Sequence, residues 1–466
     1  TLDGGDRGAF SAQFINGFGS ITINQEAAGS GTTNLQALSA SGSIAINLGT
    51  GSGSGNVTLS SVTTNTGFTL TGEQNSDIDI EAMDTSAALT ITNAGEGTLD
   101  ASAIDSNTTI SITKGVGSGE TVTFQTISSI GATSISLSGS SGTISASTIQ
   151  AGGFSLDTSA LLEDTTTNFI NTLSVSGQTT ISLGVGGLSV SSITVQSAGI
   201  TLTKGAGSSD LTAEILSVSS NGANSLTTIV GAGSGSFVVS AITTTSGFLF
   251  DGSGMATGGQ YFSAETISNT SAAVTFNYGT GNAAFLEASA VDSVSGFSLI
   301  GTNLSTGNII IADLSSTTNI TFDLGGMSGS AVISTIDSQG TFTFDGGDAA
   351  NLAMNIEHVS ASAATVTLGA VSQDTHANEI SAINVTNAFT LNGSAYREIF
   401  TADTISASAV SVTFGDLSDA FSVSALEAVN FTFAGGDGAN FSAEITNASV
   451  TGSDWSISMP ELGNGL

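Results

Sequence analysis

The sequence predicts an all-β protein: a parallel β-solenoid, of the β-helix or β-roll type, with about twenty coils of about 23 residues each. Three observations predict this fold. A short apolar motif recurs from end to end, a longer motif follows it at a constant position, and Gly, Ser, Thr, Ala and Asn fill the segments between them. A compact core stops growing at roughly 250–300 residues. Because the chain has 466 residues and no composition break, we expect one continuous repeat domain over 1–466.

The first motif is a pair of apolar residues separated by one polar residue. This period of two predicts a short strand with one face turned inward. Its copies are about 23 residues apart and never drift out of phase, which is typical of a solenoid. The copies include Ile21/Ile23, Ile44/Ile46, Phe68/Leu70, Leu89/Ile91, Ile110/Ile112, Ile181/Leu183, Phe248/Phe250, Phe297/Leu299, Phe342/Phe344, Phe389/Leu391, Phe431/Phe433 and Trp455/Ile457.

The second motif is apolar-x-apolar-x-x-apolar and follows a loop rich in Gly, Ser, Asp and Asn. The change from a two-residue to a three-residue step predicts a strand that ends in a corner. Ser and Thr occupy the outward positions, where they suit an exposed pleat. Examples of this motif are Val57/Leu59/Val62, Ile78/Ile80/Met83, Val122/Phe124/Ile127 and Ile309/Ile311/Leu314.

Two short strands cannot bury a core alone, so the coils must stack, with each strand pairing to its equivalent in the next coil. Nearly all of the 24 Phe residues follow the inward pattern, and we therefore expect them in the core.

Other repeat folds fit the sequence less well. Serial sandwiches would show turns every 8–12 residues without the constant phase, and propeller blades need roughly 40–50 residues. Helical arrays would need Ala, Leu, Glu and Lys where this chain has Ser, Thr, Gly and Val.

The charge balance excludes several classes of function. The chain has four basic residues against 38 acidic ones, with a net charge of −34, so it lacks the clustered Lys and Arg that bind nucleic acid. No apolar run approaches the ~18–20 residues that span a bilayer, so we expect no membrane insertion. The absence of cysteine excludes disulfides and thiolate sites. The partner that the carboxylates would attract is a divalent cation, chiefly Ca²⁺.

Acidic residues in the turns are the candidate metal ligands. Carboxylates from adjacent turns would come together in a stack of coils, and Ca²⁺ takes several oxygen ligands. The alternative is that these residues are solvated turn formers, since Asp-Gly and Gly-Asp are ordinary turn sequences. The candidates are Asp3, Asp6, Asp345, Asp348, Asp416, Asp419 and Asp437.

Three of these turns carry Gly-Gly-Asp sequences that suggest a family. They are Leu2-Asp3-Gly4-Gly5-Asp6, Phe344-Asp345-Gly346-Gly347-Asp348 and Gly435-Gly436-Asp437-Gly438-Ala439-Asn440. With the repeat style of the whole chain, they resemble the β-solenoid region of secreted bacterial S-layer proteins, a group that overlaps the repeats-in-toxin proteins. The toxin nonapeptide is G-G-x-G-x-D-x-U-x in tandem, whereas these copies are isolated and Asn440 stands where Asp is expected. The resemblance implies secretion, self-assembly and Ca²⁺ dependence.

Nothing in the sequence indicates catalysis, and we predict that the protein is not an enzyme. The two histidines, His358 and His376, fall in different repeats, whereas a general base needs a positioned partner and a cleft. Polysaccharide-cleaving β-helices usually line a groove with Lys, Arg or aromatic residues, whereas this chain has four basic residues and we expect nearly all of its phenylalanines in the core.

We therefore expect an extracellular, cell-surface structural protein that assembles with itself into an S-layer lattice or a filament. The apolar pattern runs from Leu2 to Ile457 with no amphipathic capping helix, and uncapped coils favour head-to-tail strand addition. The alternative is a binding module: an adhesin stalk or an ice- or glycan-binding solenoid, with cell-surface glycan as partner. Regular outward Thr-x-Thr rows would indicate such a module, and the outward positions are expected to mix Ser, Thr, Asn and Asp irregularly.

Overall fold

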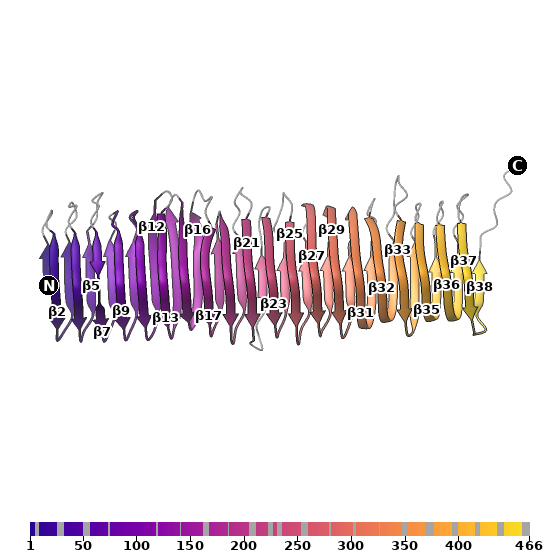
Figure 1. Ribbon diagram of the computed structural model, residues 1–466, viewed down its shortest axis with the longest axis horizontal. Coiled ribbons are helices and arrows are strands. Elements are labelled where there is room, and N and C mark those ends of the chain that lie inside the picture. Colours follow the sequence, from indigo (N-terminus) through magenta and orange to yellow (C-terminus); the bar gives the residue numbers. More distant parts are fainter. Residues whose placement is uncertain are drawn as a thin grey trace. The chain divides into compact units, whose positions relative to one another are not determined.

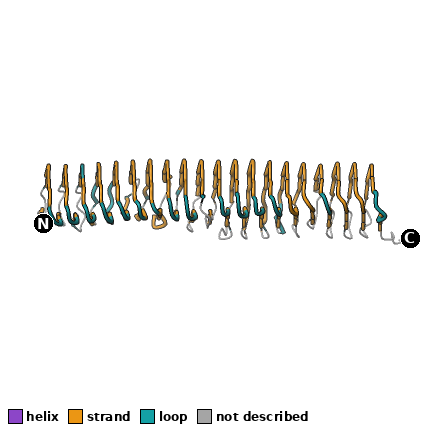
Figure 2. The backbone as a smooth tube through the Cα atoms, turned by 90° about the horizontal axis from the view of Figure 1, so that it is seen from below, coloured by secondary structure: helices purple, strands orange, loops and turns teal. Residues whose placement is uncertain are grey.

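The computed structural model divides into two compact units, unit 1 (Thr1–Leu226) and unit 2 (Thr227–Leu466). The residues that it describes are 1–4, 9–25, 32–49, 56–72, 75–117, 120–139, 141–161, 167–184, 186–204, 211–221, 227–230, 235–252, 260–278, 281–301, 304–325, 327–346, 352–368, 377–393, 399–414, 420–435 and 442–458. All elements described are strands, and no described segment is drawn as a helix (Figure 2).

Unit 1 is a parallel β-solenoid in which each turn contributes a strand to each of two faces (Figure 1, indigo to magenta). Face A holds the shorter strands: β1 (Leu2–Gly4), β3 (Ile21–Gln25), β5 (Ile44–Leu48), β8 (Phe68–Gly72), β10 (Leu89–Asn93), β12 (Ile110–Val116), β14 (Ala132–Gly139), β16 (Gly153–Leu161), β18 (Thr179–Leu183) and β20 (Ile200–Lys204). Face B holds β2 (Phe10–Gly17), β4 (Thr33–Ala40), β6 (Val57–Leu59), β7 (Val62–Thr64), β9 (Ile78–Thr85), β11 (Leu99–Ser106), β13 (Glu120–Ser129), β15 (Gly142–Ala151), β17 (Thr167–Val175), β19 (Gly187–Val195) and β21 (Leu211–Ser220).

Unit 2 repeats this arrangement, with four strands long enough to run through both faces. Face A contains β22 (Thr227–Val230), β24 (Phe248–Asp251), β26 (Val274–Asn277), β28 (Phe297–Ile300), β30 (Ile320–Asp323), β34 (Ala388–Gly393) and β38 (Trp455–Ser458). Face B contains β23 (Gly235–Thr244), β25 (Gln260–Asn269), β27 (Gly281–Ser293), β29 (Leu304–Ser316), β33 (Ala377–Val385) and β37 (Ser442–Val450). The continuous strands are β31 (Gly329–Asp345), β32 (Leu352–Leu368), β35 (Ile399–Thr413) and β36 (Ala420–Ala434).

The predicted parallel β-solenoid and its ~23-residue spacing are confirmed. The apolar pairs named in the sequence analysis lie in face A, one pair to a turn, and all of them except the last are buried. In the last pair, Trp455 and Ile457 are 48% and 49% exposed, so this pair ends a stack without enclosing a core of its own. The expectation of one continuous domain over 1–466 stays a prediction.

The core consists of inward columns in which equivalent residues of successive turns lie on one another. Ile44 and Ile46 align with Phe68 and Leu70, and all four side chains are buried. In unit 2 aromatic rings fill these columns, and the rings of Phe262 and Phe276 meet edge to face with centroids 5.0 Å apart. Such ring pairs add to the stabilisation that burial alone provides.

The predicted corner is present in face B. In β9 the buried residues alternate as far as Ile80, and then two exposed residues, Glu81 and Ala82, precede buried Met83.

The expectation that nearly all phenylalanines are core residues fails at three positions: Phe14, Phe18 and Phe169 are 82%, 99% and 53% exposed. Phe14 lies at the corner of β2 and Phe169 at an outward position of β17, while Phe18 lies in a turn, so none of the three shares the inward phase.

A column of buried polar residues occupies the last inward position of face B. In unit 2 the hydroxyl of Ser293 donates to the carbonyl oxygen of Gly296 at 2.6 Å, and that of Ser338 donates to Thr318 O at 2.6 Å. In unit 1, Ser106 Oγ likewise donates to Ala87 O at 2.8 Å. These side chains give carbonyl groups of the tight turn between the faces a second hydrogen bond, since Gly296 O also accepts from Val274 N at 2.9 Å and Thr318 O from Gly340 N at 3.1 Å. The column therefore fixes the turn from inside.

Glycine is required where neighbouring turns come closest. At Gly329, which begins β31, φ is 133°, a value that side chains other than glycine rarely adopt. A Cβ atom added there would lie 1.8 Å from the carbonyl oxygen of Gly307, in the neighbouring turn. The backbone pairing of β29 with β31 thus depends on the missing side chain.

Candidate functional site

Most of the predicted calcium ligands lie outside the described residues, namely Asp6, Asp348, Asp416, Asp419 and Asp437. Asp3 falls in β1, but its side chain is also outside the described part. Asp345 ends β31 with a half-exposed side chain and aligns in register with Asp323 of β30. Two carboxylates are fewer ligands than Ca²⁺ takes. Within the described ranges no three Asp, Glu or His residues come together as a metal site.

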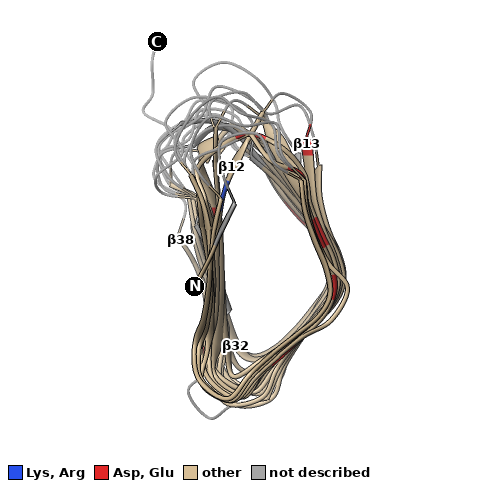
Figure 3. Ribbon diagram, turned by 90° about the vertical axis from the view of Figure 1, so that its left-hand side faces the viewer, with Lys and Arg blue, Asp and Glu red and all other residues tan. Residues whose placement is uncertain are grey.

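Carboxylates stack in pairs on face B of unit 1. Asp79 of β9 aligns with Asp100 of β11, and Asp84 aligns with Asp105 in the same two strands. Figure 3 shows acidic positions along the side of the ribbon that carries β13, which is face B. Like charges directly opposite one another destabilise a strand pair, so these columns lower the stability of this part of unit 1.

One lysine is buried in unit 1, where sequence reasoning gave it no role. Lys114 of β12 is fully buried, and its Nζ donates to the carbonyl oxygens of Gly95 at 2.7 Å and Gly115 at 2.8 Å. Burial lowers its pKa to about 8, against the opposing effect of the nearby carboxylates, of which Glu120 acts most strongly. Glu120 Oε2 accepts from the backbone N–H groups of Gly97 and Gly117 at 2.7 and 2.6 Å. Lys114 and Glu120 thus link the loops of successive turns, which is a structural role.

One outward row of face A is more regular than the irregular mixture expected from the sequence, whereas the row beside it mixes Asn, Thr, Ser and Asp as expected. In unit 1 the register places small, uncharged residues in one row along the strands, all but one of them with a hydroxyl group: Thr22, Ala45, Thr69, Thr90, Ser111, Ser134, Ser155, Thr180 and Thr201. The row beside it begins with a ladder in which Asn47 Nδ2 donates to Asn24 Oδ1 at 2.7 Å and Thr71 Oγ1 donates to Asn47 Oδ1 at 3.0 Å. Most residues of the first row are the middle residues of the apolar pairs, such as Thr69 between Phe68 and Leu70, and the strand register adds Ser134 and Thr180 to them.

The first and last described turns each present an unpaired strand edge. Among the described residues, β1 and β2 pair on one edge only, with β3 and β4, and β37 and β38 pair only with β36. Side chains at positions that face inward in the other turns are exposed here. Leu2 is 38% exposed in β1, and Trp455 and Ile457 are about half exposed in β38. Trp455 packs on Phe431 of the preceding turn, with ring centroids 5.2 Å apart, and no described strand pairs with the other edge of β38. These edges are the candidate assembly sites.

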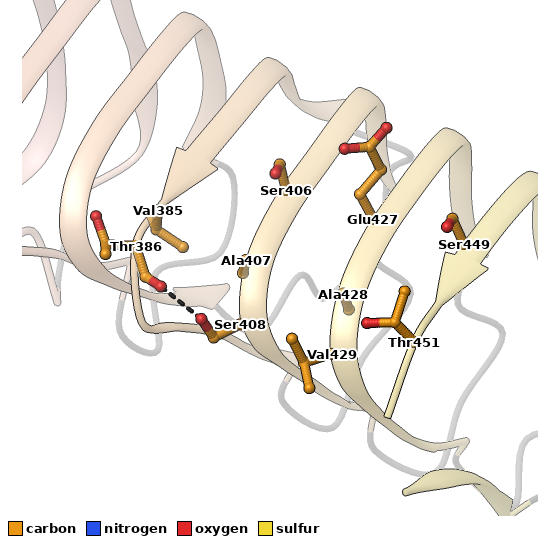
Figure 4. Close-up of a pocket in the computed structure, with 10 residues that line it drawn as sticks. All are labelled: Val385, Thr386, Ser406, Ala407, Ser408, Glu427, Ala428, Val429, Ser449 and Thr451. Carbon is orange, nitrogen blue, oxygen red and sulfur yellow. Dashed lines mark hydrogen bonds between the residues drawn. The ribbon is translucent and has the colours of Figure 1, made fainter. Parts of the chain in front are cut away.

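A hollow crosses four successive turns of unit 2, where face B bends toward the tight turn (Figure 4). Its volume is about 420 Å³, and it is lined by Val385, Thr386, Ser406, Ala407, Ser408, Glu427, Ala428, Val429, Ser449 and Thr451. Ser406 aligns with Glu427, and Glu427 with Ser449, so these three outward side chains form one row. The sequence gave no signal for this hollow, since each turn contributes only two or three of its residues.

No protein-family model, curated protein or solved structure matches this chain. Its class is therefore defined by its fold alone, as a parallel β-solenoid. In the described part of the chain no helix has the length and apolar character to cross a membrane.

Proposed function

We propose that the protein is a structural, self-assembling surface protein whose copies join end to end through β-strand addition. The observation that supports this proposal is the pair of open strand edges, each bearing exposed side chains with the inward phase. Open edges of this kind recruit further strands. A contact between the last turn of one copy and the first turn of the next is heterologous, so it propagates into a filament or lattice.

The two edges are complementary in side-chain size. In β2 and in β37 the inward residues have the same spacing of two, three and two residues around the corner. Suppose that β2 of one copy pairs with β37 of another in the register by which β37 pairs with β36. Each aligned pair of inward residues then combines a larger side chain with a smaller one. The pairs are Phe10 with Ala443, Ala12 with Ile445, Ile15 with Ala448, and Gly17 with Val450.

The same continuation works in face A. There β1 would add to β38, which places Leu2 on Ile457 and covers one apolar side chain with another. Burying apolar area contributes about 25 cal/mol per Å², and volume-matched columns avoid both cavities and overpacking. The junction would thus reproduce the packing that joins turns within each unit.

The proposal is tested by a matched pair of lysine substitutions. Ile457→Lys places a charge in the junction, while Ile310→Lys places one at an outward position of β29 with nearly the same exposure, 47% against 49%. We expect polymers of the wild type and of Ile310→Lys in negative-stain images and sedimentation profiles. For Ile457→Lys we expect a critical concentration at least tenfold higher, because a buried unpaired charge is costly. Equal assembly of both variants, or monodisperse wild type at high concentration, would refute the proposal.

We further propose that the protein acts outside the cell and that Ca²⁺ bound by turn carboxylates stabilises the polymer. Two observations support a cation partner. The chain has 38 acidic residues against four basic ones, and the carboxylate-bearing residues Asp323 and Asp345 align in register. Carboxylates from stacked turns supply the oxygen ligands that Ca²⁺ prefers. Thermal unfolding with Ca²⁺, with Mg²⁺ and with a chelator tests this point: we expect stabilisation by Ca²⁺ beyond that by Mg²⁺, and an equal effect of both ions would indicate charge screening alone.

The uncharged row of face A favours a second candidate, binding to ice. Its hydroxyl groups repeat at the ~4.8 Å spacing of the strands, and a regular array can match a periodic surface. An ice-recrystallisation assay tests this candidate. We expect inhibition by the wild type and its loss on Thr69→Lys, which interrupts the row at a half-exposed position. Failure of the wild type to inhibit would exclude it.

A further inference from the structure

The floor of the hollow in unit 2 is formed by the inner column of face B. Earlier in the unit this column holds Ser293, Ser316 and Ser338, which bond to the tight turn. In the turns that line the hollow it holds apolar residues instead, namely Val385, Ala407 and Ala428. The two alanines are 8% and 7% exposed, so their methyl groups form a shallow apolar floor without hydroxyl groups.

Above this floor the lining is polar. Ser406, Glu427 and Ser449 lie in one row along the outside of the ribbon (Figure 4). On the other side, toward the tight turn, lie Thr386, Ser408, Val429 and Thr451. Ser408 Oγ donates to the carbonyl oxygen of Thr386 at 2.7 Å, which orders that rim. The hollow thus offers hydroxyl groups that donate and accept hydrogen bonds, one carboxylate that accepts them, and an apolar floor.

This chemistry restricts the ligand. An anion is disfavoured because the only charged lining residue is Glu427, in a chain with a net charge of −34. A metal cation needs several oxygen ligands of high charge, and the lining has a single carboxylate. A purely apolar ligand would leave the hydroxyl groups without partners. A neutral, polyhydroxylated molecule with apolar C–H faces meets all three conditions.

The size and period of the hollow suit a short saccharide chain. Four turns at a strand spacing of ~4.8 Å span roughly 14 Å, the length of a few linked sugar rings. The volume of about 420 Å³ falls within the usual range of ligand sites. We propose that this hollow binds a neutral oligosaccharide lying along the solenoid axis, with its hydroxyl groups on the Ser406/Glu427/Ser449 row and its C–H faces on Ala407 and Ala428.

The proposal stands independently of end-to-end assembly and is tested with cellotetraose as the probe, by calorimetry and ligand-observed NMR. Glu427→Gln removes the charged acceptor and keeps the shape, and we expect about tenfold weaker binding, since hydrogen bonds to charged groups contribute more than neutral ones. Ser406→Leu fills the hollow and should abolish binding. Asp337→Asn is the control, because Asp337 occupies the equivalent exposed position of β31, outside the hollow.

Binding of cellotetraose by the wild type and by Asp337→Asn, with the two losses above, would support the assignment. Tetragalacturonate, the acidic counterpart, should bind at least tenfold more weakly. The proposal would be overturned by no binding of the neutral tetrasaccharide to folded wild type, by unchanged affinity of Glu427→Gln and Ser406→Leu, or by a preference for the acidic probe. A far-UV circular dichroism spectrum shows whether each variant keeps the strand content of the wild type.

Discussion

Phe276 is the residue whose truncation should damage unit 2 most. Its side chain is fully buried, and its ring lies 5.0 to 6.5 Å, centroid to centroid, from five other aromatic rings: those of Phe248, Phe250, Phe262, Tyr278 and Phe297. Core Phe→Ala substitutions cost about 3–5 kcal/mol, and aromatic pairs add to the loss. We therefore expect Phe276→Ala to lower the free energy of unfolding by about 4–5 kcal/mol.

Urea unfolding followed by circular dichroism measures this loss. Phe276→Leu should cost much less, about 1–1.5 kcal/mol, because it nearly conserves volume. Phe169→Ala, at a position 53% exposed, should cost under about 1 kcal/mol. Because turns of a solenoid contact only their neighbours, we also expect the Phe276→Ala transition to broaden or split. A loss below about 2 kcal/mol, or one no larger than that of Phe169→Ala, would refute the stacked aromatic core.

Three further predictions concern single interactions. The pKa of Lys114 in the folded protein is about 8, below the ordinary lysine value of 10.5, so the unfolded state binds more protons between these pH values. Stability should therefore rise by about 1–3 kcal/mol from pH 8 to 10.5, and urea titrations of Lys114→Met should lack this rise. Asp100→Asn relieves the repulsion with Asp79 and should raise stability by about 0.2–1 kcal/mol at low salt. Salt screens such repulsion, so the gain should shrink at high salt. A gain in melting temperature that does not depend on salt would contradict this reasoning. Ser293→Ala removes one of the two donors to Gly296 O and should cost about 0.5–1.5 kcal/mol in the same urea assay. No loss would show that the inner hydroxyl column does not hold the turn.

The repeat and its corner could be predicted from the sequence because each turn carries the same local pattern. The apolar pair Ile44/Ile46 and the three-residue step before Met83 each report a geometry within one strand. Nothing beyond the spacing of apolar residues was needed to align one turn with the next. The exposed Phe14 and Phe169 show the limit of that reasoning, because residue type indicates burial only when the phase agrees.

Features that depend on several turns could not be predicted. The hydroxyl row of face A follows the middle residue of the apolar pairs over most turns, but its continuation through Ser134 and Thr180 requires the register of the strand pairs. The buried ammonium of Lys114 depends on backbone carbonyl groups that no side-chain pattern reveals. The hollow around Glu427 depends on alanines from neighbouring turns, each unremarkable in its own repeat. The predicted calcium ligands remain untested, since most of them lie outside the described residues.

The tryptophan fluorescence of the assembling protein tests end-to-end strand addition most directly. Trp455 is the only tryptophan, lies in β38 at an open edge, and is 48% exposed. If a second copy adds its first turn to this edge, Leu2 covers Ile457, and the indole two residues earlier on the same inward face becomes partly shielded from water. We expect its emission to shift to shorter wavelength and acrylamide quenching to fall as concentration rises and particles grow, with neither change in Ile457→Lys. Particles that grow while the emission and quenching of Trp455 stay constant would contradict end-to-end addition.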